Sequence, residues 1–120
     1  MQILVVDDDV LAGEMTAAVL EEQGHEVIQA EDAVAAMEQL NAHAGVQLIV
    51  SDMNMPLVNG VEFYRELKKQ GNTLPFILLT GDDPDVARAM EPGLDACIMK
   101  DFSLDETLPD AIARVMATRS

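Results

Sequence analysis

Short apolar runs in this sequence end in polar residues whose types suit the handling of phosphoryl groups. These residues are Asp7, Asp8 and Asp9 after the run at 3–6, Asp52 after 46–50, Thr80 at the end of 75–80, and Lys100 after 96–99. Magnesium ions in proteins are typically held by one or two carboxylates together with phosphate oxygens. An ammonium group stabilises the negative charge of a transferring phosphoryl group. We therefore predict a site in which Asp8 and Asp52 hold a divalent cation near Lys100.

The apolar runs themselves predict a parallel β-sheet. Five of them, at 3–6, 26–30, 46–50, 75–80 and 96–99, alternate with stretches that favour helices. Runs of Val, Ile and Leu without polar alternation are typical of central strands that are buried on both faces. The repeated strand and helix pattern predicts an α/β fold. In such a sheet ligands bind outside the carboxyl ends of the strands, which is where the polar residues above fall.

Glycines mark the ends of the first three expected helices. The helices are expected over 9–23, 33–43 and 59–70, and they close at Gly24, Gly45 and Gly71. Glycine favours the left-handed turn that ends many helices. Asp83 and Pro84 begin a fourth helix of only about two turns, because Pro92 disfavours helical geometry at the residue before it. We predict that the segment 82–93 is the most mobile part of the chain, with a segment held rigid by its packing as the alternative.

The last helix has a capping signal and an internal proline. Ser103 and Glu106 have the spacing of a capping box. Pro109 follows soon after, so the helix either kinks there or begins near Thr107 with the proline in its first turn.

Length and composition predict one domain, residues 1–120, of a soluble cytoplasmic protein. Hydrophobic residues make up 49% of the chain, yet no stretch approaches the roughly 18 apolar residues that a membrane helix needs. No secretory leader precedes the first run, and the single Cys97 fits a reducing compartment. The formal net charge of −15 would repel a phosphate backbone, so nucleic acid is not expected as a direct partner.

The segments ILVVDDD and VSDMNMPLVNG, with Thr80 and Lys100 following in order, resemble the response-regulator receiver domains of two-component signalling, including the single-domain chemotaxis type. The resemblance spans nearly the whole chain. It implies a (βα)5 doubly wound, five-stranded parallel sheet of flavodoxin-like order 2-1-3-4-5. It also implies that Asp7 and Asp8 are the family's acidic pair and that Asp52 is its phosphoacceptor.

The same resemblance assigns a role to each site residue. Asp52 would take a phosphoryl group from a phosphohistidine on a sensor histidine kinase or a histidine phosphotransfer protein. Asp8 would ligate Mg²⁺ directly, Asp7 through water or hydrogen bonds, and the backbone carbonyl of Asn54 would add a ligand. Thr80 and Lys100 would bind the phosphoryl oxygens, and Thr80 would draw its loop inward.

The resemblance further implies a switch in place of a turnover enzyme. The chain would catalyse only its own phosphoryl transfer and dephosphorylation. A downstream effector protein would read its state, commonly at the face made by the fourth helix, the fifth strand and the fifth helix. A phosphorylation-dependent dimer is a further expectation.

Two positions depart from the family pattern. Asp101 stands where a proline generally follows the lysine in a cis linkage, so the Lys100–Asp101 bond is expected to be trans or strained. Cys97 stands where an aromatic residue often couples to the threonine loop, and we interpret it as a packed core thiol.

Other polar residues have plainer interpretations. Asp9 is expected in the first turn of the first helix. His25 and His43 are expected at the surface. On the first helix Ala12, Met15, Thr16 and Val19 form the expected inward face, which leaves Val10, Leu11 and Glu14 at the rim of the site. We predict that this rim docks the kinase or phosphotransfer helix bundle.

Three alternative functions remain open from the sequence. A non-phosphorylating, receiver-like docking or dimerisation module would fit the unusual residues at 97 and 101. A magnesium-dependent phosphatase similar to the haloacid dehalogenase group needs a second aspartate two residues after the nucleophile, where Asn54 stands. A flavodoxin-like electron carrier needs a flavin-phosphate loop, where this chain has three aspartates and only 3% aromatic residues overall.

Overall fold

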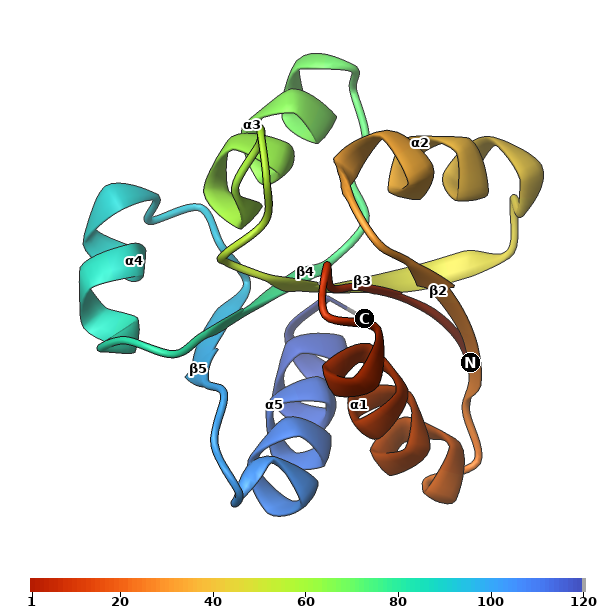
Figure 1. Cartoon of the computed structure of the whole chain (residues 1–120), viewed down its shortest axis with the longest axis vertical. Coiled ribbons are helices and arrows are strands. Elements are labelled where there is room, and N and C mark those ends of the chain that lie inside the picture. The colour runs from red at the N-terminus through yellow and green to blue at the C-terminus, as the bar shows by residue number, and fades with distance from the viewer. Residues whose placement is uncertain (120) are drawn as a thin grey trace.

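The computed structural model describes residues 1–119, which form one five-stranded parallel sheet with helices on both faces (Figure 1). The strands are β1 (Gln2–Val6), β2 (Glu26–Ala30), β3 (Val46–Asp52), β4 (Phe76–Thr80) and β5 (Ala96–Met99). Their order across the sheet is β2-β1-β3-β4-β5, and every pairing is parallel. The predicted fold class and strand order are confirmed. Strand β3 is two residues longer than expected, because it includes Ser51 and Asp52.

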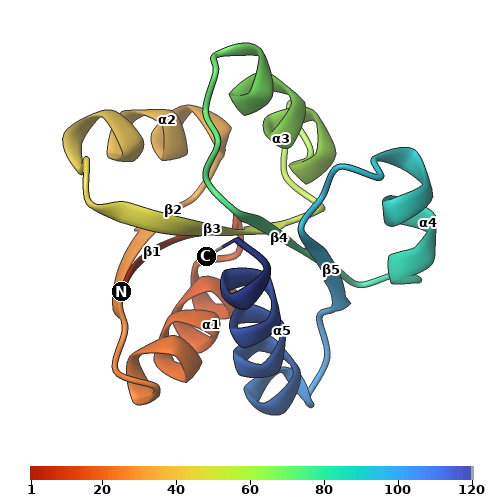
Figure 2. The same ribbon diagram turned by 180° about the vertical axis from the view of Figure 1, so that it is seen from behind.

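The sheet divides the core into two layers. The helices are α1 (Val10–Glu22), α2 (Ala33–Ala42), α3 (Gly60–Lys69), α4 (Pro84–Met90) and α5 (Leu104–Arg119). Phe63 and Leu67 of α3, with Ala36 of α2, pack on one face of the sheet. Leu20 of α1 and Leu108 of α5 pack on the other, where the two helices lie side by side (Figure 2). Strands β1, β3 and β4 are buried on both faces, as their continuous apolar runs predict.

Side-chain caps fix where the first four helices begin. The side chains of Asp9, Asp32, Asn59 and Asp83 each accept a hydrogen bond from a backbone N–H in the first turn of the helix that follows. Asp9 is therefore the N-cap of α1 and does not lie in its first turn, which corrects the expectation. Asn59 forms a full capping box with Glu62. Helix α4 has seven residues and is as short as its two prolines predict.

Two of the three predicted glycine turns are confirmed. Gly24 and Gly71 have φ angles of +89° and +80°, which a residue with a side chain adopts at a cost. Gly45 does not adopt a positive φ, and His43 ends α2 two residues earlier.

The start of α5 differs from the predicted capping box. The helix begins at Leu104, so Pro109 lies inside it and not in its first turn. Ser103 does not direct its hydroxyl into a box with Glu106; its backbone N–H and hydroxyl both donate to Oδ1 of Asp101, at 2.9 and 2.6 Å. Asp101 thereby holds the turn that enters α5.

Helix α4 is tied to α3 at its carboxyl end. The Arg65 guanidinium donates to the Glu91 carboxylate at 2.9 Å and to the carbonyl of Met90 at 2.8 Å. The Tyr64 hydroxyl donates to the carbonyl of Gly93 at 2.8 Å. The amino end of α4 follows directly from the polar end of β4. These contacts anchor one end of α4, and the predicted mobility of 82–93 stays a prediction.

None of the helices described is both long enough and apolar enough to cross a membrane.

Candidate functional site

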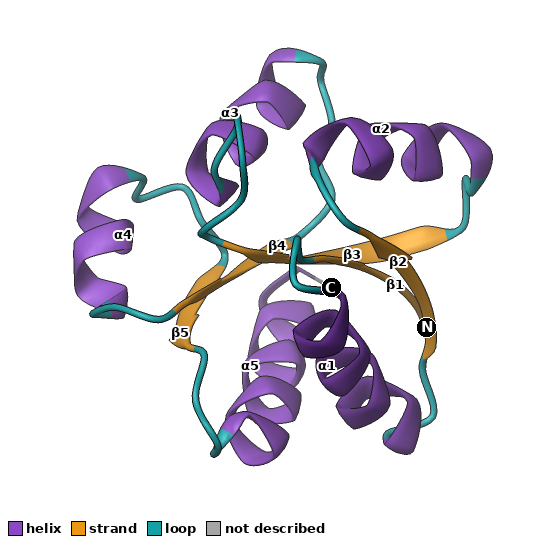
Figure 3. Cartoon of the chain, in the orientation of Figure 1, coloured by secondary structure: helices purple, strands orange, loops and turns teal. Residues whose placement is uncertain are grey.

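The predicted site residues gather at one edge of the sheet because parallel strands end on the same side. Asp7 follows β1, Asp52 ends β3, Thr80 ends β4 and Lys100 follows β5, each at the start of a loop that leads to a helix (Figure 3). The backbone links these strand ends, since the N–H of Lys100 donates to the carbonyl of Thr80 at 2.7 Å. Asp7, Asp52 and Thr80 are buried.

The Lys100 ammonium lies between two carboxylates. Its Nζ donates to Oδ2 of Asp7 at 2.5 Å and lies 3.5 Å from Oδ1 of Asp52. The other oxygen of Asp7 accepts the backbone N–H of Asp9 at 2.9 Å, so both oxygens of Asp7 have partners. No peptide bond in the described residues is cis, so the Lys100–Asp101 bond is trans and still brings the lysine to the carboxylates.

Three carboxylates form a candidate metal centre. One oxygen from each of Asp7, Asp8 and Asp52 lies within 4.8 Å of the others. Asp8 is exposed, whereas the other two are buried. A set of hard, negatively charged oxygens with one open side fits Mg²⁺, which keeps several water ligands and tolerates few protein ligands. The donor set therefore fits the predicted cation.

Burial and crowding of charge set the protonation equilibria of the site. Burial raises the pKa of Asp52 above its usual value, and the charges of Asp7 and Asp8 act in the same direction, whereas Lys100 opposes them. For Lys100, burial alone would lower the pKa. The hydrogen bond to Asp7 and the charge of Asp52 outweigh burial, so the pKa of Lys100 is raised and the ammonium form is favoured.

Thr80 and Asn54 lie on loops beside this cluster. The Thr80 hydroxyl oxygen accepts a hydrogen bond from the backbone N–H of Asp82 at 3.1 Å. The hydroxyl proton of Thr80 therefore points away from that N–H. Asn54 is exposed in the loop between β3 and α3. The predicted roles of Thr80 and of the Asn54 carbonyl stay predictions.

Two residues that shape the loop after Asp52 were not predicted from the sequence. Gly60 begins α3 so close to β3 that an added Cβ would lie 2.6 Å from the Asp52 carbonyl oxygen and 2.5 Å from Leu78 Cδ1. Leu57 is fully exposed with a φ of 68°, which is uncommon for a residue with a side chain. The only signal for Gly60 was its place directly after a good N-cap residue, Asn59.

The outward face of α1 is larger than predicted. Val10, Leu11 and Glu14 are exposed as expected, but Met15 is also 65% exposed. The inward face consists of Gly13, Thr16, Ala17 and Leu20. Of the predicted inward set, Thr16 is buried, Ala12 and Val19 are only half-buried, and Met15 belongs with the rim, which corrects the prediction.

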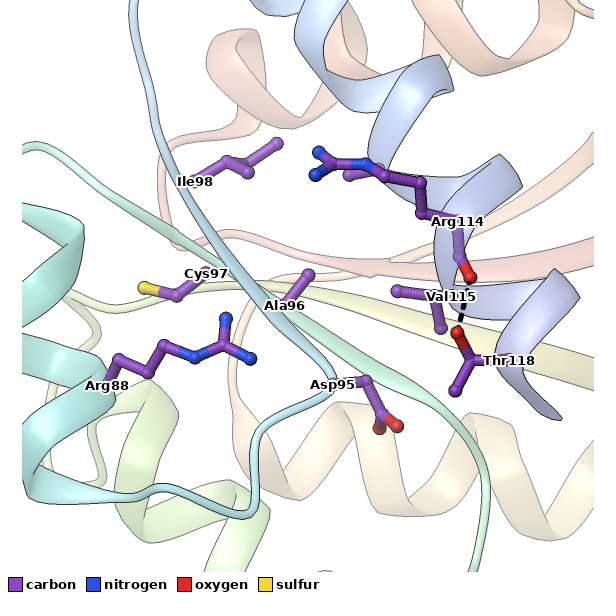
Figure 4. Close-up of a pocket in the computed structure, with 9 residues that line it drawn as sticks. Arg88, Asp95, Ala96, Cys97, Ile98, Arg114, Val115 and Thr118 are labelled. Carbon is purple, nitrogen blue, oxygen red and sulfur yellow. Dashed lines mark hydrogen bonds between the residues drawn. The ribbon is translucent and has the colours of Figure 1, made fainter.

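Cys97 and His25 both differ in part from their plain interpretations. Cys97 is half-buried and packs against the core on the α4 side, and it also lines a hollow of about 230 Å³ between α4 and α5 (Figure 4). Burial raises the pKa of the Cys97 thiol, which favours its protonated form. His43 is exposed as predicted. His25 is only half-exposed, with a buried Nδ1 that has no hydrogen-bond partner among the described residues, and burial lowers its pKa.

Comparison with known proteins agrees with this geometry. Residues 3–113 match the response regulator receiver domain family. The chain is 37% identical over 120 residues to the phosphate regulon transcriptional regulatory protein PhoB of Escherichia coli, and the match covers 97% of this chain. The match covers 50% of that relative, so the chain spans about half of its length.

Solved structures show the same fold. The signal receiver domain of a histidine kinase from Syntrophus aciditrophicus superposes with a TM-score of 0.83 at 33% identity, covering 98% of this chain and 90% of the other. The response regulator TrrA of Thermotoga maritima, solved in complex with Mg²⁺ and BeF, gives a TM-score of 0.81 at 26% identity, covering 95% and 97%. The chain described here thus belongs to the response regulator receiver domain family.

Proposed function

We propose that this receiver domain accepts a phosphoryl group on Asp52 from a phosphohistidine donor, in a reaction that depends on Mg²⁺, and that the modification switches its binding to a partner protein. One observation supports the proposal above others. The carboxylates of Asp7, Asp8 and Asp52 lie within 4.8 Å of one another, with the Lys100 ammonium 3.5 Å from Asp52. This arrangement combines a nucleophile, a cation site and a fixed positive charge.

The chemistry assigned to Asp52 is nucleophilic. A carboxylate oxygen of Asp52 attacks the phosphorus atom, a P–O bond forms, and the P–N bond to the donor imidazole breaks with its electron pair passing to nitrogen. Bound Mg²⁺, held by Asp8, Asp52 and the Asn54 carbonyl with Asp7 in support, would supply positive charge opposite the phosphoryl oxygens. Because transfer of this kind needs mainly positioning and charge stabilisation, the protein requires no separate acid or base.

Lys100 and Thr80 bind the product in this proposal. When Asp52 becomes an aspartyl phosphate, the Lys100 ammonium can leave its present contact with Asp7 for a phosphoryl oxygen. The Thr80 hydroxyl donates to a second oxygen, and because its loop leads straight into α4, that bond would move the amino end of the helix.

The surface next to the site suits a docking partner. Val10 and Leu11 of α1 are large apolar residues that are 57% and 66% exposed, directly after the acidic residues. Such residues beside a functional site mark interaction surfaces. We propose that these residues, with Glu14, dock the kinase or phosphotransfer helix bundle. Replacing Leu11 by Ala should lower the transfer rate from a protein donor about tenfold and leave the reaction with acetyl phosphate unchanged; equal rates from the protein donor would contradict the docking role.

The deciding test is the intact mass of the protein after incubation with acetyl phosphate and Mg²⁺. We expect a gain of one phosphoryl group that requires the metal and is absent in Asp52→Asn. If wild type gains no mass and also fails to bind beryllofluoride, phosphorylation is excluded, and the chain is a docking or dimerisation module. Turnover of a phosphate ester would instead indicate an enzyme.

A further inference from the structure

The charge of the chain is divided very unevenly along the sequence. Residues 1–64 contain 12 aspartates and glutamates and no lysine or arginine; the first cationic side chain is Arg65. Helices α1 and α2, strands β1 to β3 and the loops between them all fall in this segment. The half of the domain that includes α1 therefore contributes no lysine or arginine side chain.

Exposed apolar side chains extend across this acidic half, from α1 to α2. Leu11 and Met15 lie one helical turn apart on the outer face of α1, and Val34 in the first turn of α2 is 67% exposed. Between the two helix starts, across the end of β2, is a hollow of about 320 Å³. Its lining consists of Val10, Gln29, Ala30, Glu31 and Ala35. The hollow is large enough to receive one or two side chains of a partner.

We infer that α1 and the first turn of α2 form a single docking surface whose partner is a phosphohistidine-bearing helical domain with lysines and arginines around an apolar patch. The surface consists of Val10, Leu11, Glu14, Met15, Glu31 and Val34. This inference rests on the function proposed above and adds to it the charge of the partner and the contact with α2.

Charge complementarity selects this occupant over others. Nucleic acid is repelled by a surface without cations. A second copy of this chain would place the same acidic residues against each other, since a two-fold dimer buries one patch against itself. A basic helical domain instead gains attraction at long range, which raises association rates by about 10- to 1,000-fold at low ionic strength. Apolar residues at the centre and charges at the rim are the usual anatomy of such interfaces.

The test compares two protein donors that differ only in charge. The probe is a histidine phosphotransfer helix bundle, phosphorylated on its histidine, in two forms with lysine or glutamate at the same exposed positions around the phosphohistidine. We expect the lysine form to transfer to Asp52 at least tenfold faster at low salt, and we expect the difference to shrink as NaCl is added.

Variants of the receiver then locate the surface. Glu14→Lys and Glu31→Lys should each reduce the preference for the lysine form, and Val34→Ala should slow transfer from it severalfold. Glu66→Lys is the matched control, because it makes the same change of charge at an exposed position of α3 that lies outside the docking surface. Every variant should react with acetyl phosphate at the wild-type rate, which also shows that it is folded.

The outcomes separate this inference from the proposed function. Equal transfer from both donors, transfer from neither, or an effect of Glu66→Lys as large as that of Glu14→Lys would overturn the basic-partner inference while acetyl phosphate still labels Asp52. Normal transfer by Val34→Ala would remove α2 from the surface. Failure of acetyl phosphate to label the wild type would overturn both proposals together.

Discussion

Lys100 places one positive charge among three carboxylates, so the site has an excess of negative charge when no cation is bound. Asp7 takes the shorter contact, at 2.5 Å, while Asp52 is held at 3.5 Å. Asp52 is thus the less well compensated of the two buried carboxylates, and burial and neighbouring charge raise its pKa. The residue proposed as nucleophile is the one whose charge the metal-free protein stabilises least.

Removing the Asp52 charge should therefore stabilise the metal-free protein. A group with a raised folded-state pKa costs stability at pH values above that pKa, where folding disfavours its charged form. We expect Asp52→Asn to raise the free energy of unfolding at neutral pH by on the order of 1 kcal/mol, measured by urea denaturation in EDTA. Saturating Mg²⁺ should stabilise the wild type further and the variant much less.

The control for this experiment is Glu66→Gln, which removes one exposed charge on α3. It should change stability by no more than about 0.5 kcal/mol. A loss of stability in Asp52→Asn would mean that the contact with Lys100 outweighs burial and repulsion.

The sequence correctly placed Asp7, Asp52, Thr80 and Lys100 together, because each stands at the end of an apolar run and the edge of a parallel sheet brings such positions together. The roles assigned to these residues stay predictions. Sequence reasoning failed for Met15 because α1 has apolar residues on nearly every side, so its rotation about its axis cannot be read from periodicity. It also missed the bonds from Ser103 to Asp101, since Asp101 replaces an expected proline and side-chain partners in a turn depend on local geometry.

At the scale of elements, the start of α3 fixes the strand that ends in Asp52. The N–H of Gly60 donates to the carbonyl of Met53 at 2.9 Å, and the N–H of Met53 donates to the carbonyl of Leu79 at 2.7 Å. These bonds join α3, the loop after Asp52 and β4. A side chain at Gly60 would push directly against this connection.

Gly60→Ala should therefore both destabilise the fold and disturb the site. The added Cβ would lie 2.6 Å from the Asp52 carbonyl oxygen, so backbone must move, at a cost of about 1–3 kcal/mol. Phosphorylation by acetyl phosphate should slow as well. Gly13→Ala is the contrasting variant, since its Cβ would make ordinary contacts of 3.4 Å with the Gln29 side chain and 3.5 Å with Asp7 Cβ. It should stabilise the fold by up to about 1 kcal/mol. Similar behaviour of the two variants in urea denaturation would contradict this account.

The contacts between α3 and α4 predict a pH-dependent contribution to stability. The hydrogen bond from Arg65 lowers the pKa of Glu91 below its usual 4.5. A lowered folded-state pKa contributes stability above pH 4.5 that is lost as the pH falls through the folded-state value. Glu91→Gln should cost about 0.2–1 kcal/mol at pH 7, as expected for a partly exposed pair.

The cost of Glu91→Gln should vanish in acid, when urea denaturation is repeated at a series of pH values well below 4.5. A cost that persists there would show that the substituted amide packs poorly at this position and that charge is not the cause. Glu66→Gln again serves as the control, because Glu66 accepts a bond from Gln70 and forms no ion pair with α4.

The fold as a whole was predictable, whereas several element ends were not. Five apolar runs with helical stretches between them leave few topologies, because parallel crossovers are right-handed and the central strands must be covered on both faces. Helix ends depend on single hydrogen bonds. Gly45 illustrates this, since the backbone leaves the helical region already at His43, with φ of −127° and ψ of 86°, and α2 ends there without a left-handed turn.

For the whole molecule, the net charge of −15 on 120 residues is the dominant electrostatic fact. Lys100 and Arg65 pair with carboxylates in the described residues, so these cations are already engaged by neighbours. The remaining carboxylates repel one another more strongly in the compact folded state than in the expanded unfolded chain. Folding therefore works against self-repulsion at neutral pH.

Screening this repulsion should stabilise the domain. Raising NaCl from low to physiological and then to high concentration shortens the Debye length from about 30 Å to about 3 Å, which weakens repulsion between surface charges. The test uses Asp52→Asn, in which the proposed cation site is removed. We expect its melting temperature to rise with NaCl by a few degrees, which corresponds to roughly 1 kcal/mol in the free energy of unfolding. The wild type should show the same rise and, in addition, a steeper response to Mg²⁺ at equal ionic strength. Because weakened ion pairs would act in the opposite direction, a melting temperature that falls with NaCl would show that pairs such as Arg65–Glu91 matter more to this fold than its net charge.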